Sequence, residues 1–145
     1  ERATGMVELV HLPDGYKPEH TARALTDQLE TLPTILRRTL TWDQGSEMRD
    51  WKEVSAATGI DIYFCDPHAP WQRGTNENTN GELRQYFAKG SDLGEYSKTD
   101  LEWVSQQLNE RPRKQLGFHT PAEEMERLLL QQPDGGQPDL LPVTV

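Results

Sequence analysis

Short runs typical of β-strands alternate with runs of helical periodicity through the first 88 residues. The β-type runs are rich in aliphatic and β-branched side chains, and the helical runs repeat apolar residues at three and four positions. In chain order these segments are residues 6–12, 18–32, 36–42, 46–58, 60–65 and 76–88. Alternation of this kind is typical of a parallel or mixed sheet flanked by helices. We therefore expect an α/β domain.

The second part of the chain is predicted to be helical and then irregular. Helical spacing continues at residues 98–109, and Thr120-Pro121 begins a last helix to about Leu130. Residues 132–145 hold three prolines and a Gly-Gly pair, which favours a loose tail. We expect one domain over residues 1–128 and a flexible tail over residues 129–145.

Size and composition narrow the class of protein. A chain of 145 residues fits one domain with a modest core. The single cysteine, Cys65, excludes an internal disulfide and fits a reducing compartment. No apolar run is long enough to cross a bilayer, and no signal peptide opens the chain. We expect a cytoplasmic protein without a membrane partner. Because the chain starts at Glu1, we also expect it to be a piece of something longer.

The net charge of −9 weighs against a broad nucleic-acid surface, because such domains usually carry a basic footprint. Neither half of the chain is basic. Basic side chains gather only locally. The two groups are Arg111, Arg113 and Lys114, and then Arg73, Arg84 and Lys89.

Two carboxylates stand where a sheet of this kind binds ligands. Asp43 ends the second β-type run, and Glu77 follows 34 positions later in the first turn of a predicted helix that Asn76 would cap. Two nearby carboxylates repel each other unless a cation compensates them. Mg²⁺ prefers carboxylates, waters and phosphate oxygens, and paired ions suit phosphodiester chemistry. A metal site built on Asp43 and Glu77 is therefore a hypothesis.

The helix that carries Glu77 has one polar face. Glu77, Asn80, Gly81 and Arg84 share it at helical spacing, while Leu83, Tyr86 and Phe87 are expected to pack against the sheet. That face could hold a metal ion and a DNA backbone together.

Simpler explanations exist for the same residues. Asp43 could be a turn residue, and Glu77 could only favour the helix dipole. Trp71 is a candidate for substrate contact, but packing would equally explain it. The run Arg111-Pro112-Arg113-Lys114 could contact a DNA backbone or be a solvated turn.

The motifs around these residues resemble a known family. Residues 66–78, which read Asp-Pro-His-Ala-Pro-Trp-Gln-Arg-Gly-Thr-Asn-Glu-Asn, are similar to the signature of bacterial transposases of the insertion-sequence-thirty family. Residues 41–45 resemble the segment around the second catalytic Asp of that family. Residues 109–114 and 118–123 resemble the segment that follows its core. The likeness covers residues 1–128.

This resemblance implies a ribonuclease H-like catalytic core of the DDE class, related to retroviral integrases, whose mixed sheet here lacks its first strand or strands. It implies that Asp43 and Glu77 are the second Asp and the final Glu of the triad, and that the first Asp falls upstream of Glu1. Two Mg²⁺ (or Mn²⁺) ions would serve cleavage of DNA at the element's ends and strand transfer into target DNA. Arg73 and Arg84 are candidates for phosphate contacts. The intact bacterial transposase is expected to be a homo-oligomer, and the isolated chain is expected to be inactive.

Other functions remain open at this point. The chain could be a non-catalytic transposase remnant that contacts DNA or protein. It could also be another ribonuclease H-like nuclease, or, least favoured, a glycosidase that uses the two carboxylates.

Overall fold

A computed structural model gives the fold and describes residues 1–43, 45–67, 74–91, 93–131 and 143–144. For residues 74–77, 93, 143 and 144 it describes the backbone only. The elements, in chain order, are α1 (Pro18–Thr31), η1 (Thr34–Leu36), β1 (Thr39–Trp42), η2 (Ser46–Met48), α2 (Trp51–Thr58), β2 (Asp61–Phe64), α3 (Gly74–Leu83), η4 (Leu93–Glu95), α4 (Lys98–Asn109), η5 (Lys114–Leu116), α5 (Pro121–Leu130) and β3 (Val143–Thr144). The mixed α/β class predicted from the sequence is confirmed.

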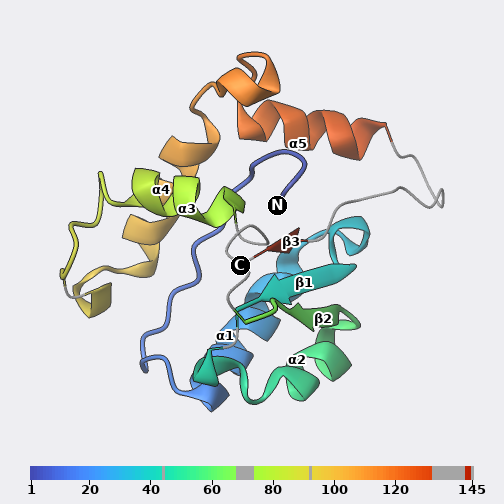
Figure 1. The fold of residues 1–145 in the computed structure, drawn as a ribbon, viewed down its shortest axis with the longest axis vertical. Helices are drawn as coiled ribbons and strands as arrows, with labels where there is room; N and C mark the ends of the chain where they lie inside the picture. Colours follow the sequence, from blue (N-terminus) through green and yellow to red (C-terminus); the bar gives the residue numbers. More distant parts are fainter. Residues whose placement is uncertain (44, 68–73, 92, 132–142, 145) are drawn as a thin grey trace.

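The sheet is small and parallel. Its strand order is β2-β1-β3, so β1 lies in the centre (Figure 1). Thr39 pairs with Asp61 and Trp42 with Phe64, while Leu40 and Thr41 pair with Val143 and Thr144. The carboxyl ends of β1 and β2 therefore meet at one edge of the sheet.

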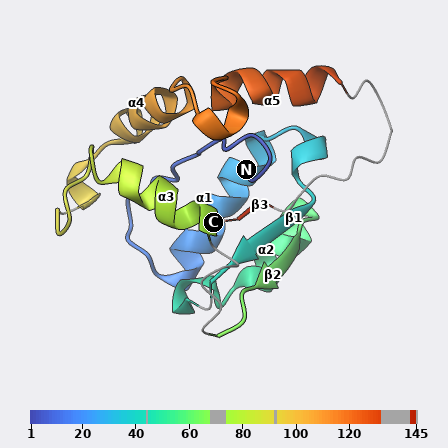
Figure 2. The same cartoon turned by 45° about the horizontal axis from the view of Figure 1, so that its top comes forward.

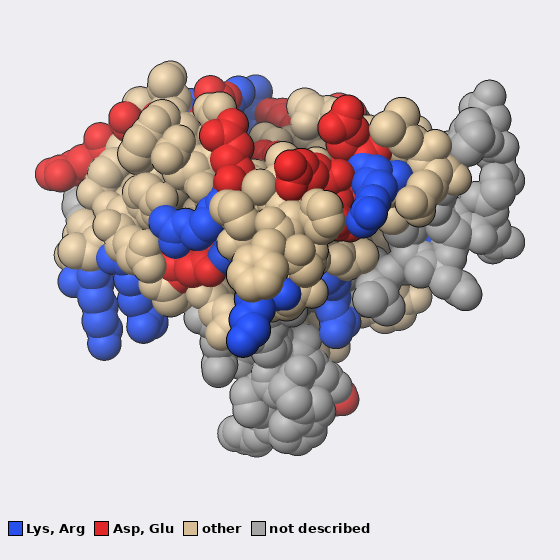
Figure 3. Space-filling model, turned by 90° about the horizontal axis from the view of Figure 1, so that it is seen from above, with Lys and Arg blue, Asp and Glu red and all other residues tan. Residues whose placement is uncertain are grey.

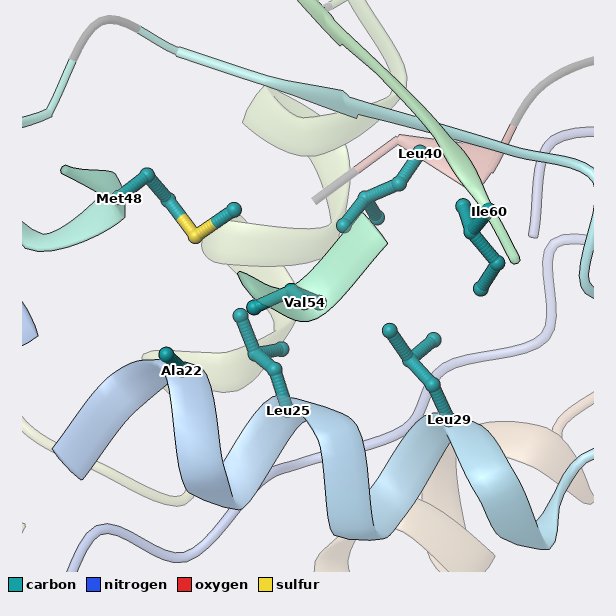
Figure 4. Close-up of a cluster of buried hydrophobic side chains, with 7 residues drawn as sticks. All are labelled: Ala22, Leu25, Leu29, Leu40, Met48, Val54 and Ile60. Carbon is teal, nitrogen blue, oxygen red and sulfur yellow. The ribbon is translucent and has the colours of Figure 1, made fainter. Parts of the chain in front are cut away.

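The core lies between the sheet and the helices α1 and α2. Ala22, Leu25 and Leu29 project from one face of α1, at the three- and four-residue spacing of an amphipathic helix (Figure 4). They meet four buried side chains from the sheet, its flanks and α2: Leu40, Met48, Val54 and Ile60. This packing fixes β1, and with it the position of Asp43.

The remaining helices form a second group. In Figures 1 and 2, α4 and α5 follow one another along the side of the molecule away from α2, and α3 lies beside α4. Ser97 and Thr120 cap α4 and α5, each in a reciprocal capping box with the residue three positions on. Val104 and Leu108 of α4 and Pro121 of α5 are buried, and the two helices contact each other.

Several predicted boundaries moved. Helix α1 ends one residue before the predicted end, and Gly59 does close α2 in the left-handed conformation, with φ of 72°. The predicted cap Asn76 is wrong, because α3 begins at Gly74 and ends at Leu83 rather than near Ala88. Helix α5 crosses the predicted boundary at residue 128, and β3 lies within the predicted tail. The flexibility of that tail stays a prediction.

The predicted strand at residues 6–12 is wrong. Among the described residues, this segment pairs with no strand. The backbone of Val7 instead exchanges two hydrogen bonds with the side chain of Asn109 at the end of α4. Apolar β-type side chains favour a pleated surface only where a neighbouring strand is available, and here a helix end takes that place.

Candidate functional site

Asp43 directly follows β1, as the sequence predicts. The Cys65 N–H donates to the carbonyl of Trp42 at 2.8 Å, which extends the pairing of β1 with β2 to the end of the strand. Asp43 is partly buried at this edge. The sheet thus holds the backbone next to Asp43, and this fixes the point from which the Asp43 carboxylate projects.

A second carboxylate lies close to the same strand end. The indole Nε1 of Trp42 donates to Oε1 of Glu47 at 3.0 Å. A Cβ placed on Gly45 would lie 1.9 Å from that oxygen, so the Glu47 carboxylate folds back over the Gly45 backbone. Sequence reasoning missed Glu47. The available signal was a glycine between the strand and an acid two positions later.

The polar face of α3 is open to solvent where it can be described. Asn80, Gly81 and Arg84 are exposed, and a Cβ on Gly81 would meet nothing within 4 Å. Glu77 lies on the same helix, one turn before Gly81. The side chain of Glu77 is not among the described parts, and Trp71 and Arg73 lie outside the described residues. Their predicted roles stay predictions.

The apolar residues just after α3 pack differently from the prediction. The ring of Tyr86 meets Trp103 of α4 edge to face at 5.8 Å between centroids, and Phe87 meets Tyr96 at 4.8 Å. The expected packing of Tyr86 and Phe87 against the sheet is therefore wrong. These aromatic rings find their partners on α4 and on the turn before it, because α3 lies beside α4.

The predicted DNA-contact residues after α4 are held by internal contacts. Arg113 pairs with Glu82, and its Nη2 donates to the carbonyl of Leu108 at 3.1 Å. Arg111 donates to Gln85 Oε1 and to the Tyr86 hydroxyl, each at 3.3 Å. Lys114 is exposed. Two of the three basic side chains of this group thus bind the chain itself.

The donor chemistry fits a hard divalent cation, although the described geometry does not assemble a full site. Carboxylate oxygens such as those of Asp43 and Glu77 are ligands that Mg²⁺ prefers. In the described part of the chain, no group of three or more His, Cys, Asp or Glu side chains is placed to hold an ion.

Charge on the surface is mixed. Figure 3 views the molecule from the end formed by α4 and α5, where acidic and basic side chains are interspersed. The pairs Lys98–Glu102 and Arg127–Glu124 are examples on these two helices. The described side chains on this face do not gather into one basic surface.

Comparison with known sequences finds relatives of this chain among bacterial transposases. The chain is 49% identical over 134 residues to the transposase for insertion sequence element IS1086 of Cupriavidus metallidurans, a match that covers 92% of this chain. It is 54% identical over 105 residues to the transposase InsI of element IS30A of Escherichia coli, covering 72% of the chain. It is 43% identical over 96 residues to the transposase of element IS4351 of Bacteroides fragilis, covering 66% of the chain. No protein-family model matches.

The match to the Cupriavidus relative covers 92% of the chain and so includes both Asp43 and Glu77. The chain belongs to the bacterial insertion-sequence transposases, and its relatives include transposases of IS30 elements. It spans 39% of the length of the Cupriavidus relative and 27% of the Escherichia relative. Within the described residues, no helix has the length and apolar content that crossing a membrane requires.

Proposed function

We propose that this chain forms part of the catalytic core of a DDE-class transposase that cuts and rejoins DNA. The observation that carries the proposal is Asp43 at the carboxyl end of the central parallel strand, in a chain 49% identical to a transposase. Ligand sites of α/β sheets lie outside such strand ends. The small sheet and its helices would then be the part of a ribonuclease H-like fold that this chain contributes.

Asp43 and Glu77 would be the residues that hold divalent cations. Bound Mg²⁺ or Mn²⁺ would supply stabilisation of the attacking and leaving oxygens of a phosphodiester. Asp43 would provide a ligand anchored by the sheet, and Glu77 one carried on α3. The exposed face with Asn80 and Arg84 would lie toward the DNA backbone. Lys114 is a further exposed cation for that backbone.

The chain alone is expected to be inactive, because the resemblance implies three carboxylates and these residues supply two. A direct assay gives the isolated chain labelled element-end DNA with Mg²⁺ or Mn²⁺ and measures strand transfer. Robust activity would contradict the expected inactivity.

The site itself is tested in a chimera that joins the preceding segment of the Cupriavidus relative to this chain. We expect element-end cleavage by the chimera, and we expect Asp43→Asn and Glu77→Gln to abolish it. Each loss should exceed the roughly 10–100-fold typical of outer partners of a metal site. Glu126→Gln, an exposed residue of α5, is the matched control. An active chimera that tolerates Asp43→Asn would sink the assignment, as would an inactive chimera beside an active relative.

A further inference from the structure

A network of side-chain contacts joins α3 to the end of α4. Arg113 contributes both of its terminal nitrogens, one to Glu82 on α3 and one to the Leu108 carbonyl in the last turn of α4. The carbonyl of Leu108 is among the last four of α4, which lack a partner within the helix. One guanidinium therefore caps the C-terminal end of α4 and pairs with a carboxylate of α3 at the same time.

The backbone aims Arg113 at these partners. Its N–H donates to the His119 carbonyl at 2.9 Å, and its own carbonyl accepts from Phe118 and Leu116 at 2.9 and 3.0 Å. Gly117 and Phe118 both adopt positive φ, which closes the short loop from Arg113 to His119. Because these hydrogen bonds fix the backbone of Arg113, they also orient its side chain toward Glu82 and Leu108.

Burial makes the Glu82 carboxylate depend on its ion pair with Arg113. The side chains of Arg113 and Glu82 are 14% and 24% exposed. The second carboxylate oxygen of Glu82 is buried and has no hydrogen-bond partner among the described residues. Among the described residues, Arg113 is therefore the group that compensates the Glu82 charge, and removing only Arg113 would leave that charge without this partner.

Arg111, two positions before Arg113, adds a second attachment, to residues just after α3. It reaches Gln85 and the Tyr86 hydroxyl just after α3 ends, and Tyr86 in turn packs on Trp103 of α4. The two arginines thus hold the last turn of α3 and the residues after it.

We propose that Arg113, supported by Arg111, is a positioning residue that sets the place of α3 and so of Glu77. Glu77 lies five residues before Glu82, about 7.5 Å along the helix axis at 1.5 Å per residue. A helix that is rigid over this length transmits any tilt at Glu82 to Glu77. The consequence for catalysis rests on the proposed function, whereas the mechanical role of the arginines does not.

The first test measures amide hydrogen exchange of α3 in the intact chain. Arg113→Ala should speed exchange over residues 78–87 about tenfold or more, as expected for loss of a charged hydrogen bond. The double variant with Glu82→Gln should exchange more slowly than Arg113→Ala alone, because it leaves no uncompensated carboxylate. Arg127→Ala, which breaks an exposed pair on α5, is the control and should stay within about twofold of the parent.

The second test separates positioning from contact with DNA. In the chimera described above, Arg113→Ala should lower the cleavage rate at saturating DNA about tenfold and leave the half-saturating DNA concentration unchanged. Arg113→Lys, which keeps the charge, should recover part of that rate. A phosphate contact would instead weaken DNA binding and lower the salt dependence by about one counterion.

Unchanged exchange in α3 with weakened DNA binding would overturn the positioning role. Equal acceleration of exchange in α1 would also overturn it, since the effect would then be global unfolding. Because hydrogen exchange needs no activity, an inactive chimera would count against the proposed function and leave the mechanical role to be decided by exchange alone.

Discussion

At the scale of single residues, two glycines show how backbone conformation, rather than available space, decides the effect of an alanine substitution on stability. A Cβ on Gly59 or on Gly81 would meet nothing within 4 Å. Gly59 has φ of 72° at the end of α2, whereas Gly81 lies inside α3. The two positions therefore form a matched pair in which only the backbone conformation differs.

Gly59→Ala should lower the free energy of unfolding by about 1–2 kcal/mol, because L-residues with a Cβ are strained in the left-handed region. Gly81→Ala should raise it by about 0.5–1 kcal/mol, because alanine loses less conformational entropy in a helix. Urea unfolding of both variants at a common m-value measures the difference. Two changes of the same sign would show that φ is not the deciding factor.

Local chemistry made some site residues predictable and hid others. Asp43 could be placed from its own neighbours, because a β-type run ends there and a turn follows. Glu47 could not, since its position depends on a hydrogen bond from Trp42 and on the absence of a side chain at Gly45, whose place its carboxylate takes. The sequence allows Arg113 either a DNA contact or a place in a solvated turn, and its contact with Glu82, 31 residues away, has no local signature.

At the scale of elements, α4 and α5 begin in the same way. The Thr120 hydroxyl accepts from the Glu123 N–H at 3.1 Å, and the Thr120 N–H donates to the Glu123 carboxylate at 2.8 Å. Hydrogen bonds from the Thr120 backbone and side chain hold the pKa of Glu123 below its ordinary value. Bonds from Ser97 do the same for the pKa of Asp100.

These lowered pKa values set a pH dependence with a definite sign. A carboxyl whose pKa is lower in the folded state stabilises the fold above its unfolded value, which is 4.5 for Glu123. That contribution disappears as the pH falls through the folded pKa. Glu123→Ala should therefore be less stable than the parent at pH 7, and the gap should shrink below about pH 4.5. Urea unfolding across this range measures the gap.

Glu126→Ala on the same helix is the control, because Glu126 is exposed and does not belong to the capping box. A Glu123→Ala gap that grows as the pH falls would contradict the assigned sign.

The predicted elements succeeded where one segment carries its own signal. Helix α1 has an apolar stripe and a proline in its first turn, and α4 and α5 have caps that can be found in the sequence. The segment at residues 6–12 has the side chains of a strand as well. Whether it becomes one depends on a neighbour that the local pattern does not specify.

At the scale of the whole molecule, the end of α4 is bound to the N-terminal segment far away in the sequence. Asn109, at the end of α4, is 5% exposed and binds the backbone of Val7, 102 positions earlier in the chain. Its Oδ1 accepts from the Val7 N–H at 2.8 Å, and its Nδ2 donates to the Val7 carbonyl at 2.7 Å. The amide thus satisfies both polar groups of one residue, as a neighbouring strand would.

Asn109→Ala should therefore release the N-terminal segment as well as weaken the fold. Two partly buried backbone groups would lose their partners, which lowers the free energy of unfolding by about 1–3 kcal/mol. Exchange at the Val7 amide should accelerate in step with that loss, while exchange in α1 should accelerate less. Asn80→Ala removes an exposed amide of α3 and is the control for loss of an asparagine as such. Unchanged protection at Val7 in Asn109→Ala would mean that other contacts hold the segment. The position of α4 against the rest of the chain would then depend on the Arg113–Glu82 pair and its neighbours. Exchange in α3, recorded in the same experiment, would measure that dependence.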